Sequence, residues 1–496
     1  MLFQRIAFVC LMALLIAPMS QAQNAETPKL PNTQAGQRVA AYLKAFNSGD
    51  EGLMRDFFNQ NVSPASLQQR PVEARIGVYR GMRANIETME LRKVLEARED
   101  FLSILVQTKK GEWLNIGFEC EKEPPHKFLG LRVEDADAPS TAEAPGGAPA
   151  ATGGAPVVMT EKEALAAIEK YLNDLVAADE FSGVVLVAKN DAPLFQRAYG
   201  LASKEYNVPN RLDTKFNLGS INKLFTQIAV GQLVSQGKLA YDDKLGKYLP
   251  DYPNHDAAQK VTIRQLLSMS SGIGDFFGPK FDATPKNRLR TISDFLPLFA
   301  NEPLAFEPGS KREYSNGGYI VLGAIIEKAS GQDYYEYVRE HIFNPAGMQS
   351  TDWYEADQPV ENLASGYTRE AMDGRAGGAR KNNIYTRPAK GSPAGGGYSN
   401  ADDLLKLALS LQTQKLRLPD FEQPVGPTGT GKPVSFERKS EGFRGIGIAG
   451  GSLGLNALLE ISPENGYTVI VMSNYDPPSA TKVGKQIRGL LARVKK

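Results

Sequence analysis

Histidine and cysteine are scarce in this chain of 496 residues. It contains three histidines, His126, His255 and His341, and two cysteines, Cys10 and Cys120. Zinc sites combine several His, Cys or carboxylate ligands at short spacings, whereas these five residues are scattered along the chain. The sequence therefore predicts no metal site, and we expect no cofactor.

The chain also lacks an excess of positive or negative charge. The chain has 57 lysines and arginines against 56 aspartates and glutamates. This near-neutral total gives no general attraction to nucleic acid or to anionic membranes. Beyond residue 22, no apolar run reaches the ~20 residues that a membrane-spanning helix needs. We therefore expect no nucleic-acid partner and no stable membrane span.

The first residues have the pattern of an export signal. Arg5 precedes a nearly continuous apolar stretch at 6–18, and the small residues at 20–22 suit a cleavage site. We predict a signal peptide at 1–22 and a mature protein that is periplasmic or secreted. One cysteine would be removed with this peptide, so Cys120 would have no partner for a disulfide within the mature chain.

The rest of the chain falls into three regions of different composition. Residues 35–137 begin with helical periodicity and continue with strand-like alternation at 114–120, which indicates a small α+β domain. Residues 138–157 are almost entirely Ala, Pro, Gly, Ser and Thr, which indicates a flexible linker. Residues 158–496 have strands at both ends and helices between them. The predicted fold class is α+β with two domains, the larger having an antiparallel sheet flanked by helices and a helical lobe.

The small domain carries one further resemblance. Residues 42–50 resemble the first helix of ketosteroid-isomerase-like cone folds, and the order of helices before strands agrees with that family. The resemblance implies a small cone-shaped domain. Its residues do not decide whether the domain binds a ligand or positions its larger neighbour.

The most informative motif is Ser220-Ile221-Asn222-Lys223. Residues three apart share a helix face, so the amine of Lys223 can lie beside the Ser220 oxygen. A serine hydroxyl becomes a strong nucleophile only when a neighbour accepts its proton, and a lysine can do this without histidine. The pattern is common by chance, and a helix cap with a solvated lysine is the alternative interpretation.

A second motif, Tyr314-Ser315-Asn316, begins 91 residues after Lys223 in a loop that opens into a helix. A phenol beside an ammonium group ionises more readily and can then accept a proton. An asparagine can donate to a substrate carbonyl and hold a lysine through its oxygen. Packing is the alternative role for a tyrosine in a loop. Together the two motifs predict acyl transfer by a serine, a lysine and a tyrosine.

These motifs and three further stretches resemble the serine β-lactamase and penicillin-binding-protein superfamily, nearest its class C and esterase-like branch. The stretches lie at 261–272, 337–348 and 395–404, in the order that the family shows. The resemblance covers residues 180–475 and implies a β-lactamase-like fold. It also implies that Ser220 is the nucleophile, that Lys223 and Tyr314 share proton transfer, and that Asn316 binds substrate.

One position departs from the family pattern. The third family motif is a basic residue, a small residue and a glycine on an edge strand, and Ile448 stands at the basic position. In the family that residue binds the substrate carboxylate and supports ionisation of the tyrosine, and isoleucine can do neither. Backbone N–H groups can still form an oxyanion hole, so we expect Gly450 and Gly451 to line the substrate site. Arg444 is an alternative source of charge, although an exposed surface arginine is the simpler interpretation.

The segment 450–454 also matches the Gly-x-Ser-x-Gly nucleophile elbow, centred on Ser452. That elbow needs a histidine later in the chain, and the last histidine is His341. We therefore interpret this segment as a glycine-rich strand and turn beside the cleft.

The sequence thus predicts an exported serine hydrolase that forms an acyl-enzyme on Ser220. Its expected substrates are small esters or D-amino-acid peptides related to cell-wall material, a class that the family resemblance implies. Ile448 favours uncharged esters or amides over β-lactams that carry a carboxylate. The alternative is a binding or regulatory module that keeps the cleft but has lost turnover.

Overall fold

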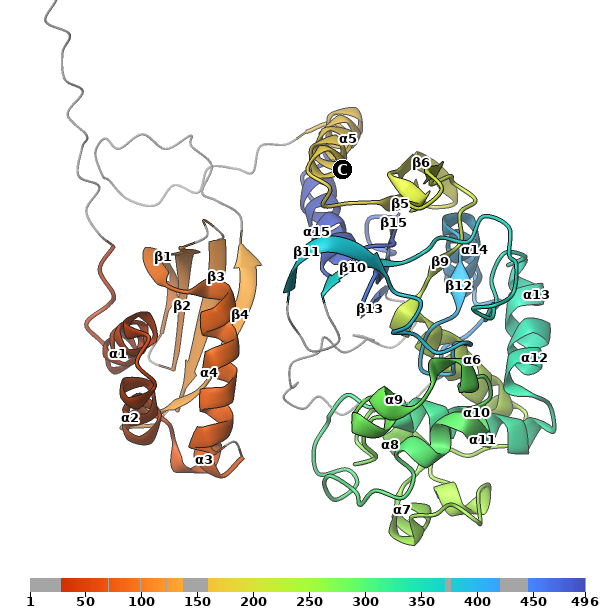
Figure 1. The fold of residues 1–496 in the computed structure, drawn as a ribbon, viewed down its shortest axis with the longest axis horizontal. Coiled ribbons are helices and arrows are strands. Elements are labelled where there is room, and N and C mark those ends of the chain that lie inside the picture. The colour runs from red at the N-terminus through yellow and green to blue at the C-terminus, as the bar shows by residue number, and fades with distance from the viewer. Residues whose placement is uncertain are drawn as a thin grey trace, which may run out of the picture. The chain divides into compact units, whose positions relative to one another are not determined.

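The structure is a computed structural model that describes most of the chain. The described residues are 28–136 except 70, 99, 110, 112 and 122, and then 159–370, 376–419 and 445–495. The chain divides into two compact units, Met1–Thr152 and Gly153–Lys496 (Figure 1). The predicted signal peptide at 1–22 and the predicted linker at 138–157 lie outside the described residues.

The first unit places its helices before an antiparallel meander (Figure 1). Its helices are α1 Gln34–Ser48, α2 Glu51–Asn61, α3 Pro64–Gln69 and α4 Val72–Ile86. Its strands, paired in chain order, are β1 Met89–Ala97, β2 Phe101–Thr108, β3 Trp113–Cys120 and β4 Phe128–Ala136. Gly49 ends α1 with a φ of 74°, and the Asp50 side chain caps α2. These two residues separate α1 from α2.

The core of the first unit lies between its helices and one face of its sheet. Ile116 and Phe118 of β3 are buried, as the alternation in the sequence predicts. The Tyr42 ring packs edge-on against Phe118, with ring centroids 5.3 Å apart. Cys120 is buried in the same core, and burial raises the pKa of its thiol. The resemblance of this unit to cone folds stays a prediction.

The second unit is built on a five-stranded antiparallel sheet. Its strands are β5 Gly183–Lys189, β6 Ala192–Tyr199, β13 Ile446–Ser452, β14 Leu455–Ser462 and β15 Tyr467–Ser473. Their order is β13-β14-β15-β5-β6, so strands from both ends of the unit meet where β15 pairs with β5. This is the sheet that the sequence predicts for the large domain, and β13 is its edge strand.

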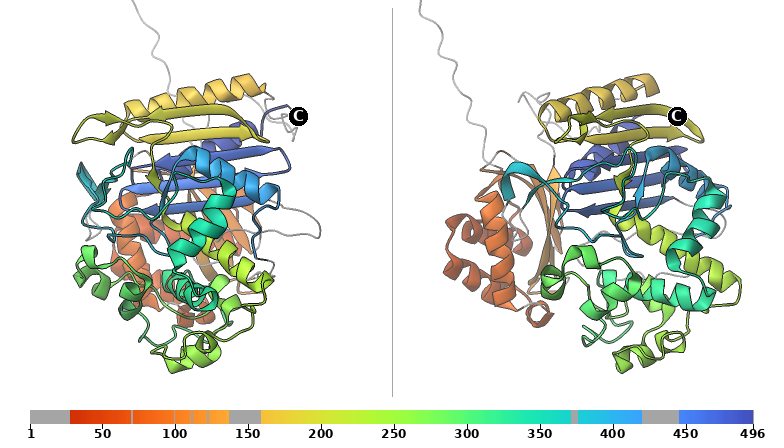
Figure 2. Two further views of the ribbon diagram at one scale, coloured as in Figure 1. Left: turned by 90° about the vertical axis from the view of Figure 1, so that its right-hand side faces the viewer. Right: turned by 45° about the vertical axis from the view of Figure 1, so that its right-hand side comes forward.

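Helices cover both faces of this sheet (Figure 2). One face packs against α5 Glu161–Ala177 and α15 Ser479–Leu491. The other face joins a large core with α6 Lys223–Ser235, α11 Asn316–Ser330 and α14 Ala401–Gln412. Successive side chains of a strand point to opposite faces, so Val185 packs in the first layer and Val184 in the second.

The helical lobe is formed by residues between β6 and β13. Besides α6 and α11, its helices are α7 His255–Lys260, α8 Ile263–Leu267, α9 Pro279–Ala283, α10 Ile292–Phe295, α12 Tyr334–Val338 and α13 Asn344–Ala346. Short strands accompany them: β7 Leu201–Ser203, β8 Val208–Pro209, β9 Phe216–Asn217, β10 Tyr367–Glu370, β11 Ala376–Asn382 and β12 Tyr398–Ser399. β9 pairs with β12, which brings the segment before Ser220 beside the segment that follows residue 397. Within the described ranges, no helix combines the length and the apolar character needed to cross a bilayer.

Candidate active site

Ser220 lies in the turn that leads into α6. Residues Gly219–Asn222 form a short 3-10 helix, and α6 begins at Lys223. The spacing of three residues brings Lys223 Nζ within 3.2 Å of Ser220 Oγ, to which it donates a hydrogen bond. Gly219 has a φ of 49°, a left-handed conformation that glycine adopts without strain. The structure therefore places the serine near the helix start and beside the lysine, in agreement with the sequence-based expectation.

Lys223 is held in one position by three hydrogen bonds. Only 1% of its surface is exposed. Besides Ser220 Oγ, its nitrogen donates to Asn316 Oδ1 at 2.7 Å and to the carbonyl oxygen of Ala394 at 2.6 Å. These acceptors match the three donors of an ammonium group, and all three are neutral. The amine therefore cannot turn away from Ser220 without leaving a buried acceptor unpaired.

Tyr314 approaches the serine from the other side. Its Oη lies 2.6 Å from Ser220 Oγ, a hydrogen bond in which either hydroxyl can be the donor. Lys223 Nζ lies 4.7 Å from the centre of the Tyr314 ring. Ser315 fixes the loop that carries Tyr314, because its hydroxyl donates to Gly274 O and accepts from Gly318 N at the start of α11. Ser220 Oγ thus contacts both an amine and a phenol, the two groups that the motifs at 220–223 and 314–316 predict beside it.

A second tyrosine lies beneath the lysine and differs sharply from the first. The centre of the Tyr319 ring lies 5.3 Å from Lys223 Nζ. Its hydroxyl accepts from Gln227 Nε2 at 2.6 Å, and burial raises its pKa far above the usual range. Tyr319 therefore stays protonated and uncharged, whereas Tyr314 is 42% exposed and lies at the surface of the site.

Asn316 connects the lysine to a carboxylate that the sequence did not single out. Its Oδ1 accepts from Lys223, and its Nδ2 donates to Asp275 Oδ2 at 2.7 Å. Asp275 follows the stretch at 261–272 by three residues, and no motif in the sequence marks it. Asn316 is thus placed to hold the lysine, as expected. One of its two amide protons is used in the hydrogen bond to Asp275, which leaves one amide proton for a substrate carbonyl.

The Ala394 carbonyl is positioned by a loop whose successive oxygens are bound by buried side chains. Tyr335 Oη donates to Gly391 O at 2.8 Å, Trp353 Nε1 to Ser392 O at 3.3 Å and Thr226 Oγ1 to Pro393 O at 2.8 Å. Lys223 donates to the next oxygen, that of Ala394. These contacts join α6, α12 and the segment after α13 around one loop.

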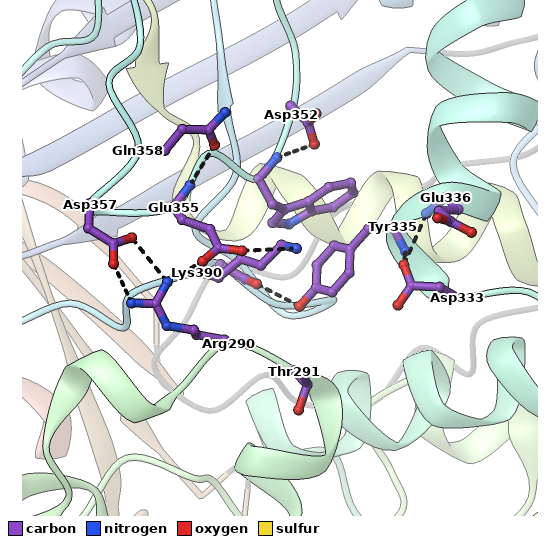
Figure 3. Close-up of polar contacts among 12 residues, drawn as sticks. Arg290, Thr291, Asp333, Tyr335, Glu336, Asp352, Glu355, Asp357, Gln358 and Lys390 are labelled. Atoms are coloured by element: carbon purple, nitrogen blue, oxygen red, sulfur yellow. Dashed lines mark hydrogen bonds and ion pairs between the residues drawn. The ribbon is translucent and has the colours of Figure 1, made fainter.

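Figure 3 shows the outer part of this arrangement. Lys390 Nζ lies 4.2 Å from the centre of the Tyr335 ring and 3.6 Å from Glu355 Oε1. Arg290 forms ion pairs with both Glu355 and Asp357 (Figure 3). Lys390, which precedes the loop, therefore contacts both α12 and Glu355, and Arg290 links Glu355 to Asp357.

We expect Tyr335→Phe to weaken this support. The change leaves the buried Gly391 oxygen without its donor, which costs about 1–3 kcal/mol of unfolding free energy. Because the loop carries the Ala394 acceptor of Lys223, we also expect kcat for ester hydrolysis to fall several-fold. Urea unfolding and steady-state kinetics measure the two effects. Tyr385→Phe removes a hydroxyl from a side chain that is 86% exposed and should change neither quantity.

The edge strand β13 lies directly against the Ser220 turn. A Cβ atom added to Gly450 would lie 2.0 Å from Leu218 O and 2.7 Å from Ser220 N, so only glycine fits there. Ile448 is 4% exposed and belongs to the core shared by the sheet and the lobe. The position that is basic in the family pattern is therefore filled here by a core side chain. Arg444 lies outside the described residues.

The segment around Ser452 has no elbow geometry. Ser452 ends β13, and a two-residue turn at Leu453-Gly454 leads back into β14, where Leu455 pairs with Ser452. A nucleophile elbow instead joins a strand to a helix. This segment is therefore a hairpin end, as the lack of a later histidine predicts. Within the described residues, no group of three His, Cys, Asp or Glu side chains is arranged to hold a metal ion.

Comparison with known proteins identifies the family of the second unit. The family model described as Beta-lactamase matches residues 168–492, which is more than half of the chain. The chain belongs to the beta-lactamase family. All of the predicted site residues fall within the matched region, and the first unit lies outside it.

Relatives within and near the beta-lactamase family include penicillin-binding proteins and an esterase. The chain is 35% identical to a penicillin-binding protein of Bacillus subtilis over 193 residues, 38% of this chain and 42% of that protein. It is 30% identical to esterase EstB of Burkholderia gladioli over 264 residues, 48% of this chain and 67% of that protein. The match thus spans less than half the length of the Bacillus subtilis relative.

A solved structure agrees with the beta-lactamase family assignment. The crystal structure of a penicillin-binding protein from Bacillus halodurans superposes with a TM-score of 0.56 at 31% identity. The match covers 64% of this chain and 99% of that chain. The predicted superfamily and the predicted fold class are therefore confirmed for the large domain.

Proposed function

We propose that this beta-lactamase family protein is a serine hydrolase that forms an acyl-enzyme on Ser220. The observation that carries the proposal is the position of Ser220 Oγ, 3.2 Å from the Lys223 nitrogen and 2.6 Å from the Tyr314 hydroxyl. The Ser220 hydroxyl is therefore within hydrogen-bond distance of an amine and a phenol, and either group can accept its proton when in the unprotonated form, as a weak nucleophile needs.

In the proposed reaction, Ser220 Oγ attacks the carbonyl carbon of an ester or amide. The Ser220 proton passes to Lys223 or Tyr314, whichever is in its unprotonated form, and that group returns the proton to the leaving oxygen or nitrogen as its bond to carbon breaks. Water then attacks the acyl carbon and gives its proton to the same group. The bond between the acyl carbon and Ser220 Oγ breaks as the proton returns to Ser220, which releases the acid. The negative oxygen of each tetrahedral intermediate is stabilised by the backbone N–H groups of Ser220 and Gly451.

The proposed substrates are small esters or D-amino-acid peptides related to cell-wall material, hydrolysed outside the cytoplasm. The similarity to a penicillin-binding protein and to an esterase supports this class. Ile448 lies in the core and supplies no charge for a substrate carboxylate. We therefore propose uncharged esters or amides before β-lactams that carry a carboxylate.

A fluorophosphonate tests this proposal directly, because it phosphonylates serines whose proton a neighbour accepts. We expect stoichiometric labelling of the purified protein, with the adduct mapped by mass spectrometry to the peptide that contains Ser220. A chromogenic short-chain ester should be hydrolysed, and prior labelling should abolish that turnover. Labelling at another residue would contradict the assignment of the nucleophile.

Ile448 also supports a second candidate, a binding or regulatory module without turnover. Across the described parts of the chain, Lys223 is the one cation that contacts Ser220 or Tyr314. If this single cation is too little for catalysis, the cleft would bind an ester or peptide and leave it intact. The absence of both an adduct and ester hydrolysis would favour this candidate over the hydrolase.

A further inference from the structure

Asp275 brings a carboxylate to the edge of the catalytic array. It lies in the loop between α8 and α9, and its side chain is neither fully buried nor fully exposed. Asp275 Oδ2 accepts from Asn316 Nδ2 at 2.7 Å and more weakly from the Asn316 backbone N at 3.4 Å. Its Oδ1 accepts from Phe277 N at 3.0 Å. Three hydrogen bonds thus separate this carboxylate from Ser220 Oγ, through Asn316 and Lys223.

The negative charge of Asp275 is not neutralised by an ion pair in the described part of the chain. Its hydrogen bonds come from neutral N–H donors, those of Asn316 and of the Phe277 backbone. The lysine linked to it, Lys223, contacts Asn316 rather than Asp275 itself. A carboxylate has about four lone-pair sites, so these contacts leave acceptor capacity for one more donor.

Two features set the charge of the cleft. The position that is basic in the family pattern is occupied by the buried Ile448. The carboxylate of Asp275 lies behind the Asn316 amide. Both features disfavour an anionic group in the substrate, and the second attracts a cationic one.

We propose that Asp275 is a specificity-determining residue that binds a protonated amine of the substrate. The substrate class would be esters or amides of α-amino acids with a free amino group, which forms a charge-assisted hydrogen bond with the Asp275 carboxylate. This inference rests on the proposed hydrolase function and narrows its substrate class.

The competing role for Asp275 is to position Asn316 and, through it, Lys223. That role predicts an equal effect on every substrate, since all of them need the lysine. A substrate-binding role predicts an effect that depends on the amine. The two roles are separated by the ratio of kcat/KM for a substrate with the amino group to kcat/KM for one without it. General damage to the site lowers both values equally and leaves their ratio unchanged.

The test compares phenyl esters of D-alanine and of propionic acid, which differ only in the amino group. Rates with Ser220→Ala give the spontaneous hydrolysis to be subtracted. At pH 6.5 we expect wild-type kcat/KM to be about ten- to hundredfold higher for the alanine ester, the range of a hydrogen bond between charged groups. The preference should fall as the pH rises through the amine pKa, about 7.7–8.0 for an α-amino group.

Asp275→Asn should reduce this ratio to within about threefold of one, because the amide keeps an acceptor but loses the charge. Asp282→Asn is the matched control: it removes the same charge from an exposed side chain in α9 and should leave the ratio at its wild-type value. A wild-type enzyme without preference for the amine, or a preference that persists in Asp275→Asn, would overturn the proposal. Failure to hydrolyse either ester, together with no fluorophosphonate adduct, would instead refute the hydrolase function itself.

Discussion

Replacing Lys223 by methionine is expected to reduce kcat/KM for ester hydrolysis to the background level of Ser220→Ala. Methionine keeps the length of the side chain but removes the nitrogen that contacts Ser220, Asn316 and Ala394. A positioned general acid or base contributes about 10²–10⁴-fold. Residues that act as a unit lose their contributions together, so we expect a loss on the order of 10⁴-fold.

The same substitution separates catalysis from folding. Lys223→Met removes the cost of burying a charge, but it also takes the Lys223 donor away from the buried oxygens of Asn316 and Ala394, at about 1–3 kcal/mol each. Urea unfolding should therefore show a folded protein that is destabilised by no more than a few kcal/mol, too little to explain the loss of activity. Lys238→Met removes an exposed amine near the end of α6 and should leave kcat/KM unchanged. A Lys223→Met enzyme that keeps a tenth of its activity would show that another group accepts the serine proton.

Gly450→Ala is expected to lower kcat/KM by about a hundredfold or more. Its Cβ would lie 2.0 Å from Leu218 O, a backbone atom that cannot move aside alone. Strand β13 and the Ser220 turn must therefore separate, and a displacement of about 1 Å in a catalytic group costs on the order of 10²-fold in rate. The loss should appear in kcat more than in KM, because the groups displaced are those proposed to hold the tetrahedral oxygen.

The same strand offers a matched control for this prediction. A Cβ added to Gly447 would have no heavy atom within 4 Å, so Gly447→Ala adds the same methyl group to β13 without a clash. Its kinetics should stay close to those of the wild type. An equal loss of kcat/KM in Gly447→Ala and Gly450→Ala would mean that β13 tolerates no added methyl group. The close approach of Gly450 to Leu218 would then not be the cause of the loss.

The parts of the site that the sequence predicts are those fixed by local geometry. Lys223 lies three residues from Ser220, and a single helical turn brings them together. The capping box of Thr160 and Glu163 at the start of α5 is local in the same way, because its two residues lie three apart. Ser452 is correctly excluded as a nucleophile by the order of residues along the chain, since no histidine follows it.

The parts that the sequence does not reveal depend on contacts between distant segments. The Ala394 oxygen that binds Lys223 belongs to the backbone, so no residue type marks it in the sequence. Asp275 lies 41 residues before Asn316, and an isolated aspartate in a loop is usually solvated. Tyr335 and Trp353 resemble ordinary core aromatics until the structure shows their donors bound to the loop.

The burial of Ile448 could be predicted from the sequence only in part. The sequence shows that the basic residue is missing, but not what replaces its contacts. Alternation along β13 places Ile446, Ile448 and Gly450 on the buried face, and both isoleucines join the core. The layer that covers Ile448 is identified only by the fold.

The row of carbonyl oxygens at residues 391–394 makes hydrolysis dependent on the complete lobe. Its donors come from positions 223, 226, 335 and 353, which are far apart in the chain and meet only when the helices have docked. An intermediate with its sheet formed but its lobe unassembled would already contain Ser220 and Lys223 as neighbours in one turn, yet the amine would have no fixed direction. Such a species would contain the reactive pair in an inactive arrangement, so hydrolysis is expected to appear during refolding only when the lobe has assembled.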